Sequence, residues 1–339
     1  MRYGHRLLVL IAAVAVLVAA GAWTVLLTAD PARGGGSDGG PPARAGAVTL
    51  GPHPDGARLV FRGMGRGPRR DHLAEVPLAG PGSTRTVAAP LCLRFHAAAG
   101  TGICLQAVHG VLEDHYRAVV LDADLHEGRR YDLAGIPTRA RVSPSGHLAA
   151  WTVFVGGDSY AGTDFSTRTS VLDTRTGALE PDLETWAVTL DGRPHRAADT
   201  NVWGVTFADD QHFYATLATG GRTWLVAGDT AARTLTTLHG NVECPSLSPD
   251  GTRIAYKKRV AGLSEDAPWR LYVLDLATMA EKPTGEQRNV DDQALWLDDR
   301  TLAYSLPGDD GADLWSVPAD GTGGPALLVA AALAPAVVR

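Results

Sequence analysis

Residues 248–256, which read Ser-Pro-Asp-Gly-Thr-Arg-Ile-Ala-Tyr, predict a tight turn that leads directly into a β-strand. The proline presets the φ angle of the second turn position, the aspartate can accept hydrogen bonds from the turn, and the glycine tolerates positive φ. After the turn, Ile254 and Tyr256 face one side of a strand and Ala255 faces the other, with a period of two. A second apolar strand follows at 271–276. The unit is therefore a turn, a strand, a longer loop and a second strand.

The same pattern recurs along the chain. Close copies of the turn begin at residues 53 and 143, and degenerate copies begin near 96, 208 and 298. The six turns are spaced by roughly 40 to 50 residues, as in the blades of a propeller, apart from one longer gap after the third turn. An aspartate occupies a similar place in the second strand of three units, at Asp122, Asp173 and Asp275.

The repeat predicts an all-β fold, because one such unit cannot bury its own apolar face and must stack against neighbours. We expect a six-bladed β-propeller of four-stranded antiparallel blades over residues 48–334, followed by a tail at 335–339. Two alternatives are a β-sandwich, in which the turns are ordinary hairpins, and a seven-bladed ring with a poorly formed unit around 179–190.

Residues 247–256, together with 271–276, resemble the repeat of TolB-type (WD40-like) propellers. The resemblance covers most of residues 48–330, although only three units carry the Pro-x-Gly turn. It implies a six-bladed propeller of the bacterial envelope. Related repeats also occur in peptidases, cyclases and lactonases, so the resemblance specifies a fold and not a reaction.

The amino-terminal sequence predicts where the propeller is located. Residues 1–6 carry two arginines and form a predicted cytoplasmic stub, and residues 7–29 contain no charged side chain. As a helix, this apolar run would span about 34 Å, enough to cross a hydrocarbon core of about 30 Å. We therefore expect a single-pass signal anchor with the propeller on the extracytoplasmic side, joined by a flexible Gly- and Pro-rich linker at 30–47. The alternative is a signal peptide cleaved near 20–22, which would release a secreted protein.

Composition gives little support for several other classes of protein. The net charge of −6 offers no electrostatic basis for binding nucleic acid. No Cys/His grouping has zinc spacing, and no acidic run has the spacing of a calcium loop, so we expect neither a metal nor a cofactor. Residues 157–162 resemble a nucleophile elbow, but alanine replaces its closing glycine, and we interpret them as a polar loop.

The three cysteines become interpretable if the propeller is exported. Cys92 and Cys104 lie on opposite sides of a predicted turn at 97–102, where a hairpin would bring them together. An extracytoplasmic compartment permits a disulfide bond between them. Cys244 occupies an equivalent strand position in its own unit, without a local partner. We expect it to be a buried free thiol.

The sequence offers one candidate binding region, a long insertion between two strands of the third unit at 156–168. It is larger than a hairpin requires, and function concentrates in loops mounted on a rigid scaffold. Its candidate binding residues are Asp158, Tyr160, Asp164, Phe165 and Arg168.

Two classes of function are compatible with these features. The first, which we favour, is a non-catalytic, membrane-tethered propeller that binds a protein, peptide or glycan at the cell envelope. The alternative is an envelope enzyme of the propeller hydrolase, cyclase or lactonase type. Because such enzymes gather acids, histidines or a metal at the central channel, the groups that line the channel should discriminate between the two. No catalytic residue is assigned.

Overall fold

The computed structural model describes residues 41–110, 114–155 and 166–339, all of which belong to one unit spanning 40–339. The predicted stub and signal anchor lie outside these residues, as does most of the predicted linker. Among the residues that are described, no helix is long and apolar enough to cross a membrane.

Residues 248–256 form the turn and strand that their sequence predicts. Gly251 has a φ of 71°, and its N–H donates to the carbonyl of Ser248 at 2.9 Å. Asp250 accepts from the backbone N–H of Thr252 at 3.0 Å, which closes the turn. The strand that follows pairs with the predicted strand at 271–276, with Ile254 opposite Leu274.

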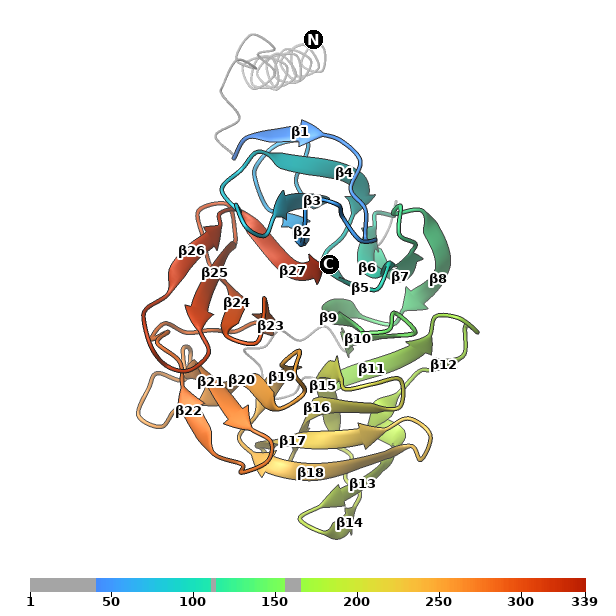
Figure 1. Ribbon diagram of the computed structural model, residues 1–339. Helices are drawn as coiled ribbons and strands as arrows, with labels where there is room; N and C mark the ends of the chain where they lie inside the picture. Colours follow the sequence, from blue (N-terminus) through green and yellow to red (C-terminus); the bar gives the residue numbers. More distant parts are fainter. Residues whose placement is uncertain (1–40, 111–113, 156–165) are drawn as a thin grey trace, which may run out of the picture. The chain divides into compact units, whose positions relative to one another are not determined.

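Six sheets, antiparallel apart from one outer pairing in each of two sheets, are arranged in a ring whose central axis we call the channel, so the structure confirms the six-bladed propeller (Figure 1). From the outer to the inner edge, the first blade contains β1 (Ala43–Ala45), β4 (Arg85–Leu91), β3 (His72–Pro77), β2 (Arg58–Gly63) and β27 (Ala332–Val338). From the inner to the outer edge, the second contains β5 (Arg94–Ala98), β6 (Thr101–Val108), β7 (His115–Leu121) and β8 (Glu127–Leu133). The third contains β9 (Ile136–Val142), β10 (Leu148–Val155), β11 (Ser166–Asp173) and β12 (Leu179–Glu180).

The remaining blades follow in chain order. The fourth contains β15 (Asn201–Phe207), β16 (His212–Thr219), β17 (Arg222–Asp229), β18 (Thr234–Gly240), β13 (Ala187–Leu190) and β14 (Arg193–His195). The fifth contains β19 (Glu243–Leu247), β20 (Arg253–Arg259), β21 (Trp269–Asp275) and β22 (Glu281–Pro283). The sixth contains β23 (Leu295–Trp296), β24 (Thr301–Leu306), β25 (Asp313–Pro318) and β26 (Ala326–Val329). A short 3-10 helix, η2 (Leu183–Thr185), follows the third blade.

The long gap in the repeat does not hide a seventh blade. Its strands β13 and β14 form a hairpin that extends the outer edge of the fourth blade, where β13 pairs in parallel with β18. Four of the six blades thus have four strands, whereas the first has five and the fourth has six. The β-sandwich alternative is also wrong, because the sheets are arranged in a ring.

The ring closes through β27, which supplies the innermost strand of the first blade by pairing with β2 (Figure 1). Residues 335–338 are therefore part of the propeller, and their assignment to a tail is wrong. At the outer edge of the same blade, β1 pairs in parallel with β4. Because β1 lies within the predicted linker at 30–47, the ordered propeller begins earlier than the sequence indicates. Both corrections involve strands that pair with a distant part of the chain.

The apolar core lies between adjacent blades, which explains the strand periodicity. In β20, Ile254 and Tyr256 pack toward the fourth blade, whereas Ala255 packs toward the sixth. In β2, Leu59 faces the sixth blade and Val60 faces the second. Successive strand residues point to opposite faces of a sheet, and here both faces are covered. Each blade is thus fixed by its two neighbours.

The expected disulfide bond joins Cys92 and Cys104, whose Cα atoms are 5.3 Å apart. Cys104 lies in β6, and Cys92 lies in the connection between β4 and β5. The bond therefore links the segment that leaves the first blade to a strand of the second blade. Cys244 is a buried free thiol in β19, as the sequence predicts.

Candidate functional site

The two ends of the channel differ in the connections that surround them. The inner strands β5, β9, β15, β19, β23 and β27 run in the same direction along the channel. We call the end where they begin the entry face; it also carries the loops between the second and third strands of the blades. We call the opposite end the turn face, because the short turns found by the repeat lie there.

The segment that precedes β23 enters the channel from the entry face. Asp292 accepts a hydrogen bond from Arg94 Nη1 in the second blade at 3.0 Å, and Arg139 Nη1 in the third blade lies 3.5 Å from its other oxygen. Burial opposes ionisation of Asp292, but attraction by Arg94 and Arg139 outweighs it, so its pKa is lowered. Asp292 thus carries a negative charge that links three blades.

The neighbouring Gln293 extends this link to two more blades. Its Nε2 atom donates to the carbonyl of Pro245 in β19 at 2.6 Å, and lies 3.2 Å from the carbonyls of Gly204 and Val205 in β15. Both inner strands have a register shift at this level. A bulge leaves backbone groups outside the regular ladder. The glutamine amide satisfies such carbonyls within the channel.

Arg141 also lies beside this segment, but fewer polar groups offset the burial of its charge. Its side chain is buried, and Nη2 donates to the carbonyl of Ala294 at 3.3 Å. Its Nε atom is buried without a hydrogen-bond partner. Burial lowers the pKa of Arg141 to about 10, so the guanidinium remains charged at neutral pH.

His96, on β5, is another buried polar group at this site. Its Nδ1 atom accepts from the backbone N–H of Val142 at 3.1 Å, which places the proton of a neutral ring on Nε2. Burial and the nearby Arg141 charge lower the His96 pKa well below its ordinary value. His96 is therefore a neutral hydrogen-bond donor.

These groups line a cavity of about 30 Å³. Its wall is formed by the inner strands β5, β9 and β27 and by the segment that enters the channel; the charged or imidazole side chains are Arg94, His96, Arg139, Arg141 and Asp292. A volume of this size holds a single small occupant.

A second charge cluster surrounds the buried Lys257 of the fifth blade. The Lys257 ammonium pairs with Asp291 and lies 3.7 Å from Glu243 Oε2. It also lies 4.2 Å from the ring centroid of Trp269, whose indole N–H donates to Glu243 at 3.0 Å. The ammonium is thus balanced by two carboxylates and one aromatic face. This cluster holds the base of the segment that carries Asp292.

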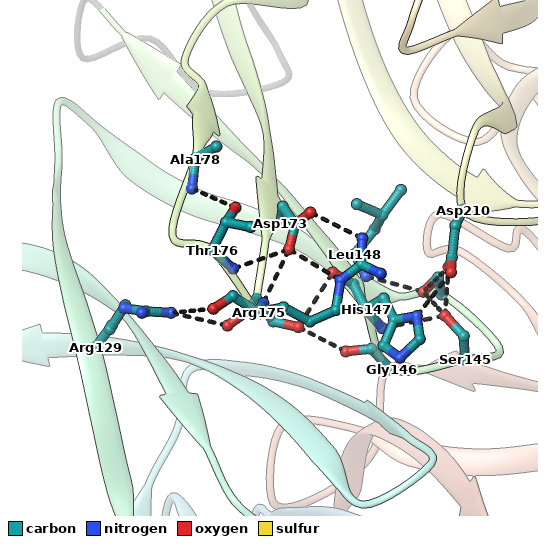
Figure 2. A network of polar contacts seen from close by, with 12 residues as sticks. Arg129, Ser145, Gly146, His147, Leu148, Asp173, Arg175, Thr176, Ala178 and Asp210 are labelled. Atoms are coloured by element: carbon teal, nitrogen blue, oxygen red, sulfur yellow. Dashed lines mark hydrogen bonds and ion pairs between the residues drawn. The ribbon is translucent and has the colours of Figure 1, made fainter.

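The turn face carries a wider groove of about 470 Å³ between the second and third blades. Figure 2 shows the polar network beside it. Arg129 Nη1 donates to the carbonyl of Thr174 at 2.9 Å, and His147 Nδ1 lies 2.7 Å from Asp210 Oδ2 in the fourth blade. The neighbouring Ser145 hydroxyl also contacts Asp210. The network braces the turns of three consecutive blades.

Of the predicted binding residues, only Arg168 lies within the described structure. It is on β11, is 47 % exposed, and its Nε lies 3.8 Å from Asp182 Oδ2. Asp158, Tyr160, Asp164 and Phe165 lie outside the described residues. The strands on either side end at Val155 and begin at Ser166, at the entry face.

Glu184, half-buried in η2, fixes the start of β11. Its carboxyl oxygens accept from Thr167 Oγ1 at 2.7 Å, from the Thr169 N–H at 3.0 Å and from the Val202 N–H at 3.2 Å. Burial raises the pKa of Glu184 to about 8. Through these hydrogen bonds the Glu184 carboxyl group joins the third blade to β15 of the fourth.

The sequence reasoning missed the channel residues. One available signal was the alternation in β9, where Arg139 and Arg141 occupy every second position of a strand that leads into one of the recognised turns. Residues two apart share a face of a strand.

Within the ranges that the structure describes, no group of three or more His, Cys, Asp or Glu residues is arranged to hold a metal ion.

Comparison with solved structures supports the architecture. TolB from Acinetobacter baumannii matches with a TM-score of 0.54 and 17% identity, covering 85% of this chain and 68% of that chain. The chain has a fold similar to TolB-type six-bladed propellers. At this identity, the TolB likeness shows the fold alone.

Two enzymes also match, with lower scores. A puromycin-hydrolysing peptidase from Mycobacterium tuberculosis gives a TM-score of 0.47 at 16% identity, covering 80% of this chain and 43% of that chain. An oligogalacturonate lyase in complex with manganese gives 0.48 at 10% identity, covering 74% of this chain and 71% of that chain. No protein-family model and no curated protein matches the sequence.

Proposed function

We propose that the chain is a non-catalytic, membrane-tethered propeller that binds a protein or peptide at the cell envelope through its entry face. The observation that carries the proposal is the distribution of exposed aliphatic side chains. Leu91 is 51% exposed at the end of β4, Ile136 is 46% exposed at the start of β9, and Leu263 is 37% exposed in the loop between β20 and β21. By strand direction, all three belong to the entry face.

These side chains favour a protein partner. They lie on the first, third and fifth blades, so a partner that contacts all three must span the face, as a folded protein can. Single exposed apolar residues are otherwise ordinary on a protein surface. The same face carries the ends of the predicted binding loop and the basic cavity of the channel. The fold similarity to TolB is compatible with an envelope protein. A glycan partner and an envelope enzyme are the alternatives that the experiments below would reveal.

The extracytoplasmic location rests on the predicted anchor at 7–29 and is supported by the Cys92–Cys104 pair, because such bonds persist in oxidising compartments. We expect a protease added to intact spheroplasts to degrade the propeller domain and leave cytoplasmic proteins intact. Protection of the propeller under these conditions would contradict the location.

The binding proposal is tested by crosslinking and pulldown from membranes. We expect Ile136→Glu together with Leu263→Glu to abolish recovery of a partner, because two charges would be buried at the contact. Leu327→Glu is the matched control, since Leu327 is 51% exposed on the outer strand β26. Equal recovery with the paired variant and with the control would overturn the proposed face. Recovery of only a glycan would identify the other class of partner.

The predicted loop has its own test. We expect Tyr160→Ala combined with Arg168→Ala to reduce partner recovery while leaving the melting temperature unchanged. Unchanged recovery would remove the loop from the site. Saturable turnover of an ester, lactone or peptide substrate by the purified protein would favour the enzyme alternative.

A further inference from the structure

We propose that the cavity at the entry end of the channel binds one small anion, either a free ion or a single carboxylate group. The direct ligands are the Arg141 guanidinium and the His96 ring N–H, with Arg94 at the cavity wall. This site goes beyond the proposed partner binding and does not depend on it.

The first argument is the balance of charge around the cavity. Its lining includes three arginines, Arg94, Arg139 and Arg141, but one carboxylate, Asp292. Asp292 is already engaged by Arg94 and Arg139, and no carboxylate lies within ion-pairing distance of Arg141 among the described residues. Buried charges are normally paired, because an isolated charge is costly to remove from water. An anion would supply the charge that this wall lacks.

The second argument is the availability of donors. Arg141 is 8% exposed, its Nε has no hydrogen-bond partner, and one Nη atom holds a carbonyl. Guanidinium groups present several N–H donors in a planar array suited to anions. His96 is also 8% exposed, and its Nδ1 is occupied by the Val142 N–H. The proton on Nε2 is thus available for donation.

The third argument is size. A cavity of about 30 Å³ admits a monatomic ion or the head of one carboxylate. The chemistry is therefore that of chloride, bromide, formate or a carboxylate presented on a partner, and these sources require separate tests.

The test with free ions uses the purified chain and chloride, bromide or formate. Each would be titrated at constant ionic strength against hexafluorophosphate, a large anion without a carboxylate head, with the melting temperature as readout. We expect a saturable rise in melting temperature for the small ions and bromide anomalous density beside Arg141 in crystals. Arg141→Gln should weaken the apparent affinity at least about tenfold, the usual effect of losing a charge-assisted hydrogen bond. Arg300→Gln removes an exposed charge at the turn face and should have no effect.

A second variant separates anion binding from a purely structural role. Asp292→Asn keeps the shape but removes the competing negative charge, so affinity for the small anions should increase even if the protein is less stable. Absence of saturable stabilisation and of bromide density in the wild-type protein would overturn the proposal, as would equal affinities for all variants.

The source of the anion is distinguished by competition. If a partner carboxylate is the natural occupant, formate should displace the partner from the wild-type protein. The loss of crosslinked partner should then follow the fraction of sites that formate occupies. If a free ion is the occupant, formate should leave partner recovery unchanged. Because the titration requires no partner, it can succeed or fail independently of the proposed function.

Discussion

At the scale of single residues, the recurring aspartate closes the turn between the third and fourth strands. Asp173 Oδ1 accepts from the Arg175 and Thr176 N–H groups at 2.9 and 3.1 Å. Asp275 accepts from the Ala277 and Thr278 N–H groups at 3.1 and 2.8 Å. Two donors held by one carboxylate favour its ionised form. The repeat therefore preserves turn chemistry at this position.

These carboxylates predict acid sensitivity. The pKa of Asp173 is lowered to about 2, first by the Arg175 side chain and then by backbone donors, and the pKa values of Asp122, Asp229 and Asp275 are also lowered. Because the folded values lie below the unfolded value of about 3.9, the stabilisation is complete above that pH and is lost as pH falls toward about 2. We expect the free energy of unfolding, measured in urea, to decrease over this interval.

The control for the acid effect is Asp275→Asn, which keeps the acceptor oxygen but cannot ionise. The variant should show a shallower dependence of unfolding free energy on pH. An unchanged slope would mean that other carboxylates determine the acid response.

Gly204 is a position where backbone geometry requires glycine. Its φ is 67°, and an added Cβ would lie 2.8 Å from the Cα of Cys244 in the neighbouring inner strand. We expect Gly204→Ala to destabilise the fold by roughly 2 to 4 kcal/mol, from left-handed strain plus overpacking. At Gly220, φ is 55° and no atom lies near an added methyl group, so Gly220→Ala measures the left-handed backbone strain alone. It should lower the free energy of unfolding by about 1 kcal/mol. Similar losses of unfolding free energy for the two variants would contradict the close approach.

At the scale of elements, the disulfide bond fixes the passage from the first blade to the second. Cys92 and Cys104 are separated by 12 positions, and in the chain-entropy model a loop of this length contributes about 3 kcal/mol. We expect a reductant to lower the free energy of unfolding by up to that amount. Cys92→Ala with Cys104→Ala should be destabilised and insensitive to the reductant. An equal effect of reductant on this variant would show that the bond is not responsible.

The site and the repeat differ in how far sequence could predict them. The three turns with Pro and Gly were predictable because these residues determine turn geometry within four residues, and the three degenerate turns were predictable from the spacing of the repeat. The channel was not, because Arg139 and Asp292 meet only through closure of the ring. An arginine within a strand ordinarily indicates a solvent-facing position, whereas here Arg139 and Arg141 of β9 are buried beside the cavity. Segment 290–294 also carries no strand or turn pattern that would place it in the channel.

At the scale of the whole molecule, the way the ring closes is the main feature that could not be predicted from the sequence. The closing strand β27 has no turn motif, and its partner β2 lies at the other end of the chain. Ala336 and Val338 contribute to the core between the first and second blades, and Ala332 to the core between the sixth and first. One strand thus completes a sheet and two interfaces at once.

We therefore predict that truncation after Ala331 abolishes cooperative unfolding. Without β27, the edge of β2 would be exposed and two apolar interfaces would be open, so the chain should also aggregate. The measurements are the urea unfolding transition followed by tryptophan fluorescence, and the association state by light scattering. Removal of Arg339 alone is the control, because this residue lies beyond the strand and its truncation should preserve the transition.

Complementation separates loss of closure from general damage to the chain. A peptide of residues 331–339 added to the truncated protein can supply the missing strand through backbone hydrogen bonds. It should restore a cooperative transition, whereas a peptide with Ala336→Asp should not, because position 336 is fully buried. A truncated chain that retains the full transition without peptide would show that the other blades hold the ring closed, and would contradict the dominant role of β27.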